Sequence, residues 1–289
     1  MKQSPPLKIS DTQAAMTAAA SIDTVRASDW SGTVHTIVVA ARSSYGQTHN
    51  IQATVPPDYV LVGGGATILP QFTKPGAFLT GNYPDSNLLT WHSSSIAHLE
   101  PFNHQLVSYA IGIKIFGLSR KQLLQHIKVT SVTSGYSSNP AVSFIIDTAG
   151  YKLIGGGAKL SSANNKLLLT SSYPYVYTWN AAGGEYESSS PGYITGTAIS
   201  ISRKLLGLKN LETSQDFGYS FVYSEGFHTG ALGTDTTWVV TGPGVLGEFL
   251  TAVIPTPQAL YGTSNSLSYS SNYPIALYML KIRKKLPQK

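Results

Sequence analysis

A segment that recurs three times constrains this fold more than any other feature of the sequence. It reads Tyr-Val-Leu-Val-Gly-Gly-Gly-Ala from Tyr59, Tyr-Lys-Leu-Ile-Gly-Gly-Gly-Ala from Tyr151 and Trp-Val-Val-Thr-Gly-Pro-Gly-Val from Trp238. Further landmarks keep nearly the same spacing in the first two copies: Tyr83-Pro84 with Tyr173-Pro174, and Trp91 with Trp179. Because self-similarity at a fixed period is a strong indicator of architecture, we predict three homologous units.

The residues between these landmarks predict β structure. From Thr33 onward, short segments rich in Val, Ile, Thr and Tyr alternate with Gly, Pro, Asn and Ser, which is typical of antiparallel strands. We expect an all-β protein of three antiparallel units around a pseudo-threefold axis, β-prism-like in shape or, alternatively, three small sandwiches. The expected boundaries are a polar N-terminal arm at 1–30, units at 31–118, 126–205 and 216–283, and a basic tail at 284–289.

The few helical signals fall outside these units. Ala14 to Ala20 predicts a short helix in the arm. The connectors after the first and second units predict one or two helical turns each, capped by Ser119 or Ser202.

The glycine triplets have two interpretations. Glycine supplies positive φ and permits close backbone contact, so a triplet in a strand marks a bend or bulge, or else a loop that approaches a ligand. The bulge is the commoner case, and we expect it here.

The Tyr-Pro to Trp segments are the strongest candidates for a binding site. An aromatic platform beside Asn and Asp suits a sugar, whose C–H face stacks on the ring while its hydroxyls need polar partners. The alternative is a buried tryptophan beneath a tyrosine in the turn. In the third unit, Tyr261 is the expected counterpart of the tryptophan. The candidate ligand-binding residues are Asn82, Tyr83, Asp85, Trp91, Tyr173, Tyr175, Trp179 and Tyr261.

An Arg-Lys pair follows the same strand in each unit. With threefold symmetry the pairs would form a basic ring at one end of the molecule, suited to a sulfated glycan, an anionic membrane or another subunit; ordinary solvated charges are the alternative. The pairs are Arg120-Lys121, Arg203-Lys204 and Arg283-Lys284.

Composition and motifs disfavour an enzyme. Charged residues are only 12 % of the chain against roughly 25 % in an average globular protein. The net charge of +6 arises largely from the C-terminal segment, which is weak evidence for nucleic-acid binding. Cysteine is absent, and no nucleophile elbow, zinc motif or phosphate loop occurs. His92, His98 and His104 do not recur between units, so we expect loop histidines, no metal and no cofactor.

Two hypotheses remain for function. The first is a non-catalytic, lectin-like protein with up to three weak glycan sites. The alternative is a structural protein, such as a coat, fibre or crystal subunit, that uses the arm and basic tail to contact neighbouring copies. The sequence has no apolar stretch typical of a membrane helix or signal peptide, so we expect a soluble protein whose partners are glycans or copies of itself.

Overall fold

The computed structural model of this chain describes most of the sequence. The described residues are 9–21, 23–71, 76–98, 100–146, 149–163, 166–185, 190–220, 222–224, 226–266 and 274–287. Residues 1–8 and 22 of the expected arm and residues 288–289 of the expected tail therefore lie outside the described part.

The strands repeat one plan three times. The first unit contains β2 (Val34–Arg42), β3 (Thr48–Thr54), β4 (Val60–Leu69), β5 (Ala77–Pro84), β6 (Thr90–Ala97) and β7 (Gln105–Ile115). The second contains β8 (Ile127–Thr133), β9 (Ala141–Ile145), β10 (Tyr151–Ser162), β11 (Leu168–Tyr175), β12 (Thr178–Gly184) and β13 (Gly192–Ser202). The third contains β14 (Leu211–Ser220), β15 (Val222–Ser224), β16 (Phe227–Gly233), β17 (Val239–Leu246), β18 (Phe249–Pro255), β19 (Ala259–Asn265) and β20 (Ile275–Lys284). The third unit thus begins at Leu211, before the expected boundary at 216.

Outside this plan lie one strand and three helices. They are α1 (Ile9–Ala20), β1 (Thr24–Ser28), α2 (Arg120–Leu124) and α3 (Arg203–Leu208). The predicted caps are confirmed: Ser119 and Ser202 accept hydrogen bonds from Gln122 N and Leu205 N, respectively. Each cap satisfies a helix-end N–H that lacks an intrahelical partner.

The strands form three antiparallel sheets, and each sheet is shared by two units. We name each sheet after one central strand. The β7 sheet has the order β1-β2-β7-β4-β18-β19-β16-β15, the β13 sheet β3-β6-β5-β10-β13-β8, and the β20 sheet β14-β20-β17-β11-β12-β9. Each sheet therefore joins the first, triplet-bearing and last strands of one unit to the remaining strands of the unit before it, with the third unit preceding the first. The all-β, three-unit prediction is confirmed.

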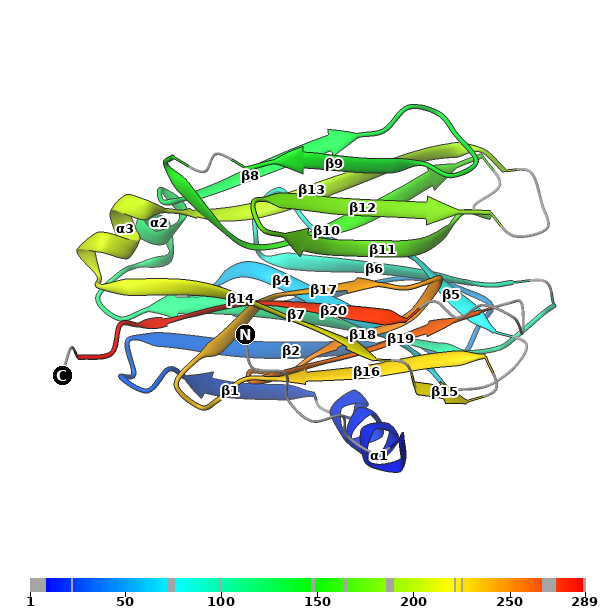
Figure 1. Cartoon of the computed structure of the whole chain (residues 1–289), viewed down its shortest axis with the longest axis horizontal. Helices are drawn as coiled ribbons and strands as arrows, with labels where there is room; N and C mark the ends of the chain where they lie inside the picture. The colour runs from blue at the N-terminus through cyan, green and yellow to red at the C-terminus, as the bar shows by residue number, and fades with distance from the viewer. Residues whose placement is uncertain are drawn as a thin grey trace.

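Within each unit the two half-sheets pack against each other. β4 and β7 contact β5 and β6 in the first unit, β10 and β13 contact β11 and β12 in the second, and β17 and β20 contact β18 and β19 in the third. Figure 1 shows the second unit, β8 to β13, above the strands of the other two. The prism-like arrangement and the three sandwiches, predicted as alternatives, therefore occur together.

The first glycine of each triplet lies where the three units meet. An added Cβ would lie 2.2 Å from the Thr241 carbonyl oxygen at Gly63, 1.7 Å from that of Val62 at Gly155, and 2.6 Å from that of Ile154 at Gly242. Each glycine thus contacts the same strand of another unit, in a closed cycle. The predicted bulge is confirmed, because the strand register shifts just before the triplet in every unit. Positive φ is not required, since none of these glycines adopts it; they are needed for close contact.

The second glycine makes room for tryptophan. An added Cβ at Gly64 or Gly156 would lie 2.3 Å or 2.7 Å from the indole of Trp91 or Trp179, respectively. In the third unit, Pro255 pairs with Leu260, just as Pro84 pairs with Trp91. The expected correspondence was therefore wrong: Leu260, not Tyr261, replaces the tryptophan. Leucine is smaller than tryptophan. Less room is therefore needed in that unit, where Pro243 replaces the second glycine.

Candidate functional site

The two tryptophans belong to the core. Trp91 and Trp179 are both 0 % exposed. Asn82 accepts a hydrogen bond from the Trp91 indole N–H, and Asp85 accepts hydrogen bonds from backbone N–H groups within its own turn. Of the two interpretations of this segment, the structure matches the buried tryptophan. The prediction that Trp91 and Trp179 bind a sugar is therefore wrong, because neither indole is exposed.

The tyrosines predicted with them lie on the sheet faces instead. Half-buried Tyr83 stacks on His92 with ring centroids 5.1 Å apart, and the Lys159 ammonium lies 5.3 Å from the Tyr83 ring. Tyr261 is half-buried on β19. Tyr173 and Tyr175 lie at the end of β11 in the β20 sheet, where they meet aromatic residues that the sequence did not single out.

Five aromatic side chains meet on one face of the β20 sheet. Tyr173 stacks on Tyr278 with centroids 4.6 Å apart, Tyr278 lies 6.3 Å from Phe217, and Phe217 meets Tyr219 edge-on at 5.7 Å. Tyr175, Phe217 and Tyr219 are 58 %, 43 % and 55 % exposed. We call these five residues the aromatic cluster, and the face that carries them the outer face.

Strand register explains why the cluster forms. Phe217 and Gly244 are both paired with Tyr278, from the two strands that flank β20. An added Cβ on Gly244 would lie 2.6 Å from Tyr173 Cα, so the third glycine of the triplet lets β11 approach closely. With no side chain between them, Tyr173 and Tyr278 stack across this position.

Burial raises the pKa of two phenols in the cluster. Desolvation raises the pKa of Tyr278 and of Tyr173, because removal from water disfavours the phenolate. A side-chain hydrogen bond with Tyr219 adds to the rise in the pKa of Tyr278. The cluster therefore presents uncharged rings with polar hydroxyls at neutral pH.

A pocket with mixed polar and apolar lining adjoins the cluster. Gln215 and Leu280 line it and lie two residues from Phe217 and Tyr278 along their strands. Lys152 also lines it, and burial together with the nearby Arg203 lowers the pKa of the Lys152 ammonium. The remaining lining residues are Ile146, Tyr151, Leu153, Val176, Tyr177, Thr213 and Ser214. The pocket thus places amide, hydroxyl and ammonium groups beside the aromatic rings.

The corresponding face of the β7 sheet is covered. Met16 of α1 is 0 % exposed, and its sulfur lies 3.6 Å from the Thr263 hydroxyl. Tyr109, paired with Gly65 as Tyr278 is with Gly244, is also 0 % exposed. The described part of the expected arm therefore packs on its own sheet.

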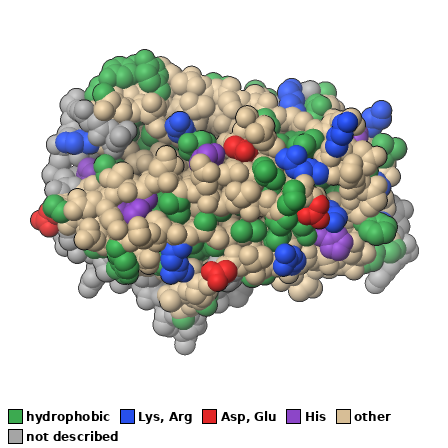
Figure 2. Space-filling model, turned by 180° about the vertical axis from the view of Figure 1, so that it is seen from behind, with side chains coloured by type: hydrophobic (Ala, Val, Ile, Leu, Met, Phe, Trp, Pro, Cys, Tyr) green, Lys and Arg blue, Asp and Glu red, His purple; other side chains and the backbone are tan. Residues whose placement is uncertain are grey.

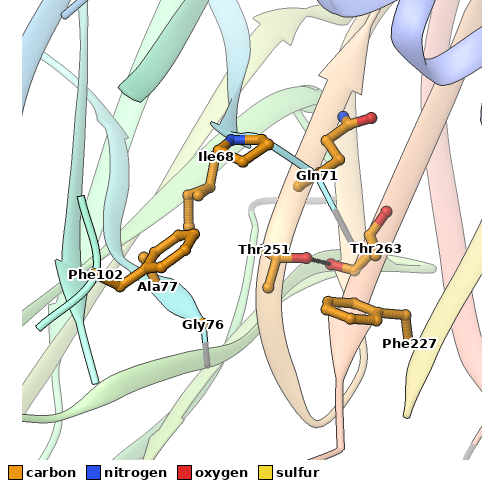
Figure 3. Close-up of a pocket in the computed structure, with 10 residues that line it drawn as sticks. Ile68, Gln71, Gly76, Ala77, Phe102, Phe227, Thr251 and Thr263 are labelled. Atoms are coloured by element: carbon orange, nitrogen blue, oxygen red, sulfur yellow. Dashed lines mark hydrogen bonds between the residues drawn. The ribbon is translucent and has the colours of Figure 1, made fainter. Parts of the chain in front are cut away.

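A second pocket lies between Ile68 and Phe102 on one side and Phe227, Thr251 and Thr263 on the other (Figure 3). Its polar groups already have partners in the structure. Thr251 donates to the Thr263 carbonyl oxygen, and Gln71 donates to the Thr67 hydroxyl. The β20 sheet is therefore the better candidate site.

The three Arg-Lys pairs lie at one end of the molecule. Figure 1 shows α2, α3 and the C-terminus together there. The pairs are not equivalent, because Arg283 and Lys284 are the last residues of β20, whereas the other two pairs lie in helices. Arg120 donates to the Tyr59, Asn87 and Leu88 carbonyl oxygens. Arg283 pairs with Glu212 and lies 4.1 Å from the Trp238 ring.

The histidines have structural contacts. Buried His104 hydrogen-bonds to Ser95 and meets His49 edge-on, while His92 stacks on Tyr83. Within the described ranges, no cluster of three metal-ligating side chains occurs.

Sequence reasoning missed Phe217, Tyr219 and Tyr278. All three lie in the third unit, where the repeated landmarks are eroded. One signal was available: Phe217 and Tyr219 alternate with smaller residues along β14 and so point to one face.

Comparisons with known proteins give no family. No protein-family model matches the chain, and no curated protein matches it. Among the described helices, none is long and apolar enough to span a membrane.

Proposed function

We propose that this chain is a non-catalytic glycan-binding protein whose principal site is the aromatic cluster on the outer face of the β20 sheet. The observation that carries this proposal is the continuous set of stacked and exposed rings from Tyr173 through Tyr278 and Phe217 to Tyr219. A saccharide stacks its apolar C–H face on such rings, and neutral rings hold it by contact rather than by charge.

The surroundings of the cluster supply partners for sugar hydroxyls. Half-buried Asn180 is the strand partner of Tyr173, and Gln215 lines the adjoining pocket. Each amide donates one hydrogen bond within the chain, Gln215 to the Pro174 carbonyl oxygen and Asn180 to the Thr178 hydroxyl. An amide has a second N–H and an acceptor oxygen, which match a hydroxyl. An extended chain of sugar units can therefore occupy the cluster and the pocket together.

The repeats supply a second and weaker candidate site. Tyr83 and His92 occupy on the β13 sheet the positions of Tyr173 and Asn180 on the β20 sheet. The third equivalent face lies under α1. We therefore propose one principal and one weak glycan site per chain, which would gain avidity from each other on a multivalent surface.

Self-assembly through the N-terminal arm remains a prediction with no specific observation in its favour, since the described part of the arm packs on its own chain.

A glycan array tests the proposal. Phe217→Ala and Tyr219→Ala remove exposed rings, and each should weaken binding of the array's strongest ligand about tenfold. Tyr136→Ala is the matched control, because Tyr136 is 59 % exposed but lies outside the cluster. Isothermal titration with the soluble oligosaccharide gives the affinities, and unchanged melting temperatures show that the variants fold. A blank array, or equal binding by all three variants, would refute the proposal.

A further inference from the structure

The end of the molecule that carries α2, α3 and the end of β20 combines exposed cations with exposed apolar side chains. We call it the basic end. Figure 2 shows Lys and Arg gathered toward it. Its cations without an acidic partner in the described part are Arg120, Lys121, Arg203, Lys204, Lys209, Lys284 and Lys285.

The acids at this end are already engaged. Asp29 accepts hydrogen bonds from the N–H groups of Thr33, Val34 and Lys284. Asp58 pairs with Lys114, and Glu212 with Arg283. Asp235 also lies near Arg283 and accepts hydrogen bonds from Thr237. In the described ranges the cations of this surface outnumber these acids, so its net charge is positive.

Large apolar side chains project among these cations. Phe116 and Leu208 are 74 % and 71 % exposed, and Leu286 and Trp30 are 47 % and 41 % exposed. Phe116 follows β7, Leu208 ends α3, and Leu286 follows β20, so each lies at the tip of its element. Because these side chains are exposed and not part of the core, they can contact a partner outside the protein.

Hydrogen bonds join these residues into one surface. The Lys209 ammonium donates to the Phe116 carbonyl oxygen at 3.4 Å. The Lys285 N–H donates to the Asn210 carbonyl oxygen at 2.9 Å, next to Lys209 in the chain. The Trp30 indole N–H donates to the Lys284 carbonyl oxygen at 2.8 Å. Phe116, Leu208, Leu286 and Trp30 therefore lie on one continuous surface.

We infer that the basic end docks on the surface of an anionic lipid bilayer. Lysines gain about fivefold in binding each near a negatively charged leaflet, while Phe, Leu and Trp enter the region between headgroups and acyl chains. The apolar tips decide between partners, because an acidic polymer uses the lysines but leaves Phe116 and Leu208 in water. This inference is independent of the glycan site, which lies on the outer face of the β20 sheet.

Vesicle sedimentation tests the inference with the full chain. The probe is phosphatidylcholine vesicles with about one third phosphatidylserine, against phosphatidylcholine alone, at about 0.1 M salt. The Lys121→Gln, Lys204→Gln, Lys285→Gln triple variant should lower the partition coefficient about a hundredfold. The Phe116→Ser, Leu208→Ser double variant should lower it at least about tenfold.

Matched controls separate docking from misfolding. Tyr45→Ser with Tyr136→Ser removes exposed aromatics beyond the opposite ends of β2 and β8, and Lys166→Gln removes an exposed cation from a loop. Both controls should partition as the unaltered chain does, with unchanged melting temperatures in all variants. Equal binding to both kinds of vesicle would overturn the inference. So would a loss in the lysine variant with none in the Phe116, Leu208 variant, since that result indicates a general acidic partner such as heparin.

Discussion

The outer faces of the β20 and β7 sheets have the same framework but are used differently. Tyr278 and Tyr109 occupy equivalent positions, paired with the third glycine of their triplets. Tyr278 stacks on Tyr173 beside exposed rings. Tyr109 lies under α1, and its hydroxyl donates to the Ala20 carbonyl oxygen at 3.4 Å. One face is open to a ligand, and the other is occupied by the chain's own helix.

The third sheet completes the comparison. On the β13 sheet the equivalent position is Thr197, whose hydroxyl hydrogen-bonds to that of Ser131. Three faces built on one framework thus differ: one carries the aromatic cluster, one is covered by a helix, and one carries the Tyr83–His92 pair beside small polar groups. Close backbone packing at the glycines allows little variation in the framework, whereas the faces only have to satisfy their own side chains.

The largest expected effect comes from disrupting the glycine contacts that make the three faces equivalent. Gly155→Ala places a Cβ 1.7 Å from the Val62 carbonyl oxygen, which is backbone and cannot move aside. We expect the free energy of unfolding, measured in urea, to fall by at least about 4 kcal/mol. Gly233→Ala, with nothing within 4 Å of its added Cβ, should change it by less than about 0.5 kcal/mol. A Gly155→Ala variant with an unaltered urea midpoint would contradict this account of the glycines.

Removing the main contact of α1 tests the covered face. Met16→Ala leaves a cavity over the β7 sheet, and we expect the free energy of unfolding to fall by about 3 kcal/mol. Ala14→Ser, at an exposed position of the same helix, is the control. Similar stabilities for the two variants in urea would show that α1 contributes little to holding this face closed.

A smaller effect compares the buried tryptophans. The Trp91 indole N–H donates to Asn82, whereas in the second unit neither Trp179 Nε1 nor the equivalent Ser172 Oγ has a partner among the described residues. Ser172→Asn should restore this hydrogen bond and raise the free energy of unfolding by about 1 kcal/mol. Asn82→Ser should lower it by a similar amount. A decrease for Ser172→Asn would mean that the second unit lacks space for the amide.

The smallest expected effect is on stability at alkaline pH, and it does not appear at neutral pH. Burial raises the pKa of both Tyr109 and Tyr278, so the unfolded chain ionises these phenols first. Their contribution to stability is complete below about pH 10 and is lost as the pH rises further. Tyr109→Phe and Tyr278→Phe should each make the melting temperature less steep in pH above this value. An unchanged alkaline profile for Tyr109→Phe would indicate that its hydroxyl is ionised equally easily in both states.

The sequence predicted those parts of the fold that repeat. The spacing of the triplets predicted three units, and the composition of the strands predicted antiparallel structure. Ser119 and Ser202 were predicted as the helix caps. The sharing of each sheet by two units was not predictable, because pairing between distant strands leaves no local pattern. Nor could the sequence decide whether Trp91 is buried, since a buried tryptophan and a sugar-binding tryptophan would both repeat between units.

The site was predictable only in part. Tyr173 and Tyr175 were singled out by the repeated Tyr-Pro turn, but their partners Phe217, Tyr219 and Tyr278 lie in the unit whose landmarks have diverged. What joins them is Gly244, whose missing side chain brings two strands of different units together. A contact that depends on an absent side chain leaves little trace in a one-dimensional pattern.

The sharing of each sheet by two units also bears on how the molecule is made. β4 pairs on one side with β7 from its own unit, but on the other side with β18, near the end of the chain. On the ribosome, that edge of β4 therefore stays unpaired until β18 has been synthesised. The first unit is made before the other two, but its pairing with the third unit comes late, and a chain terminated before β18 would leave the ribosome with an open strand edge.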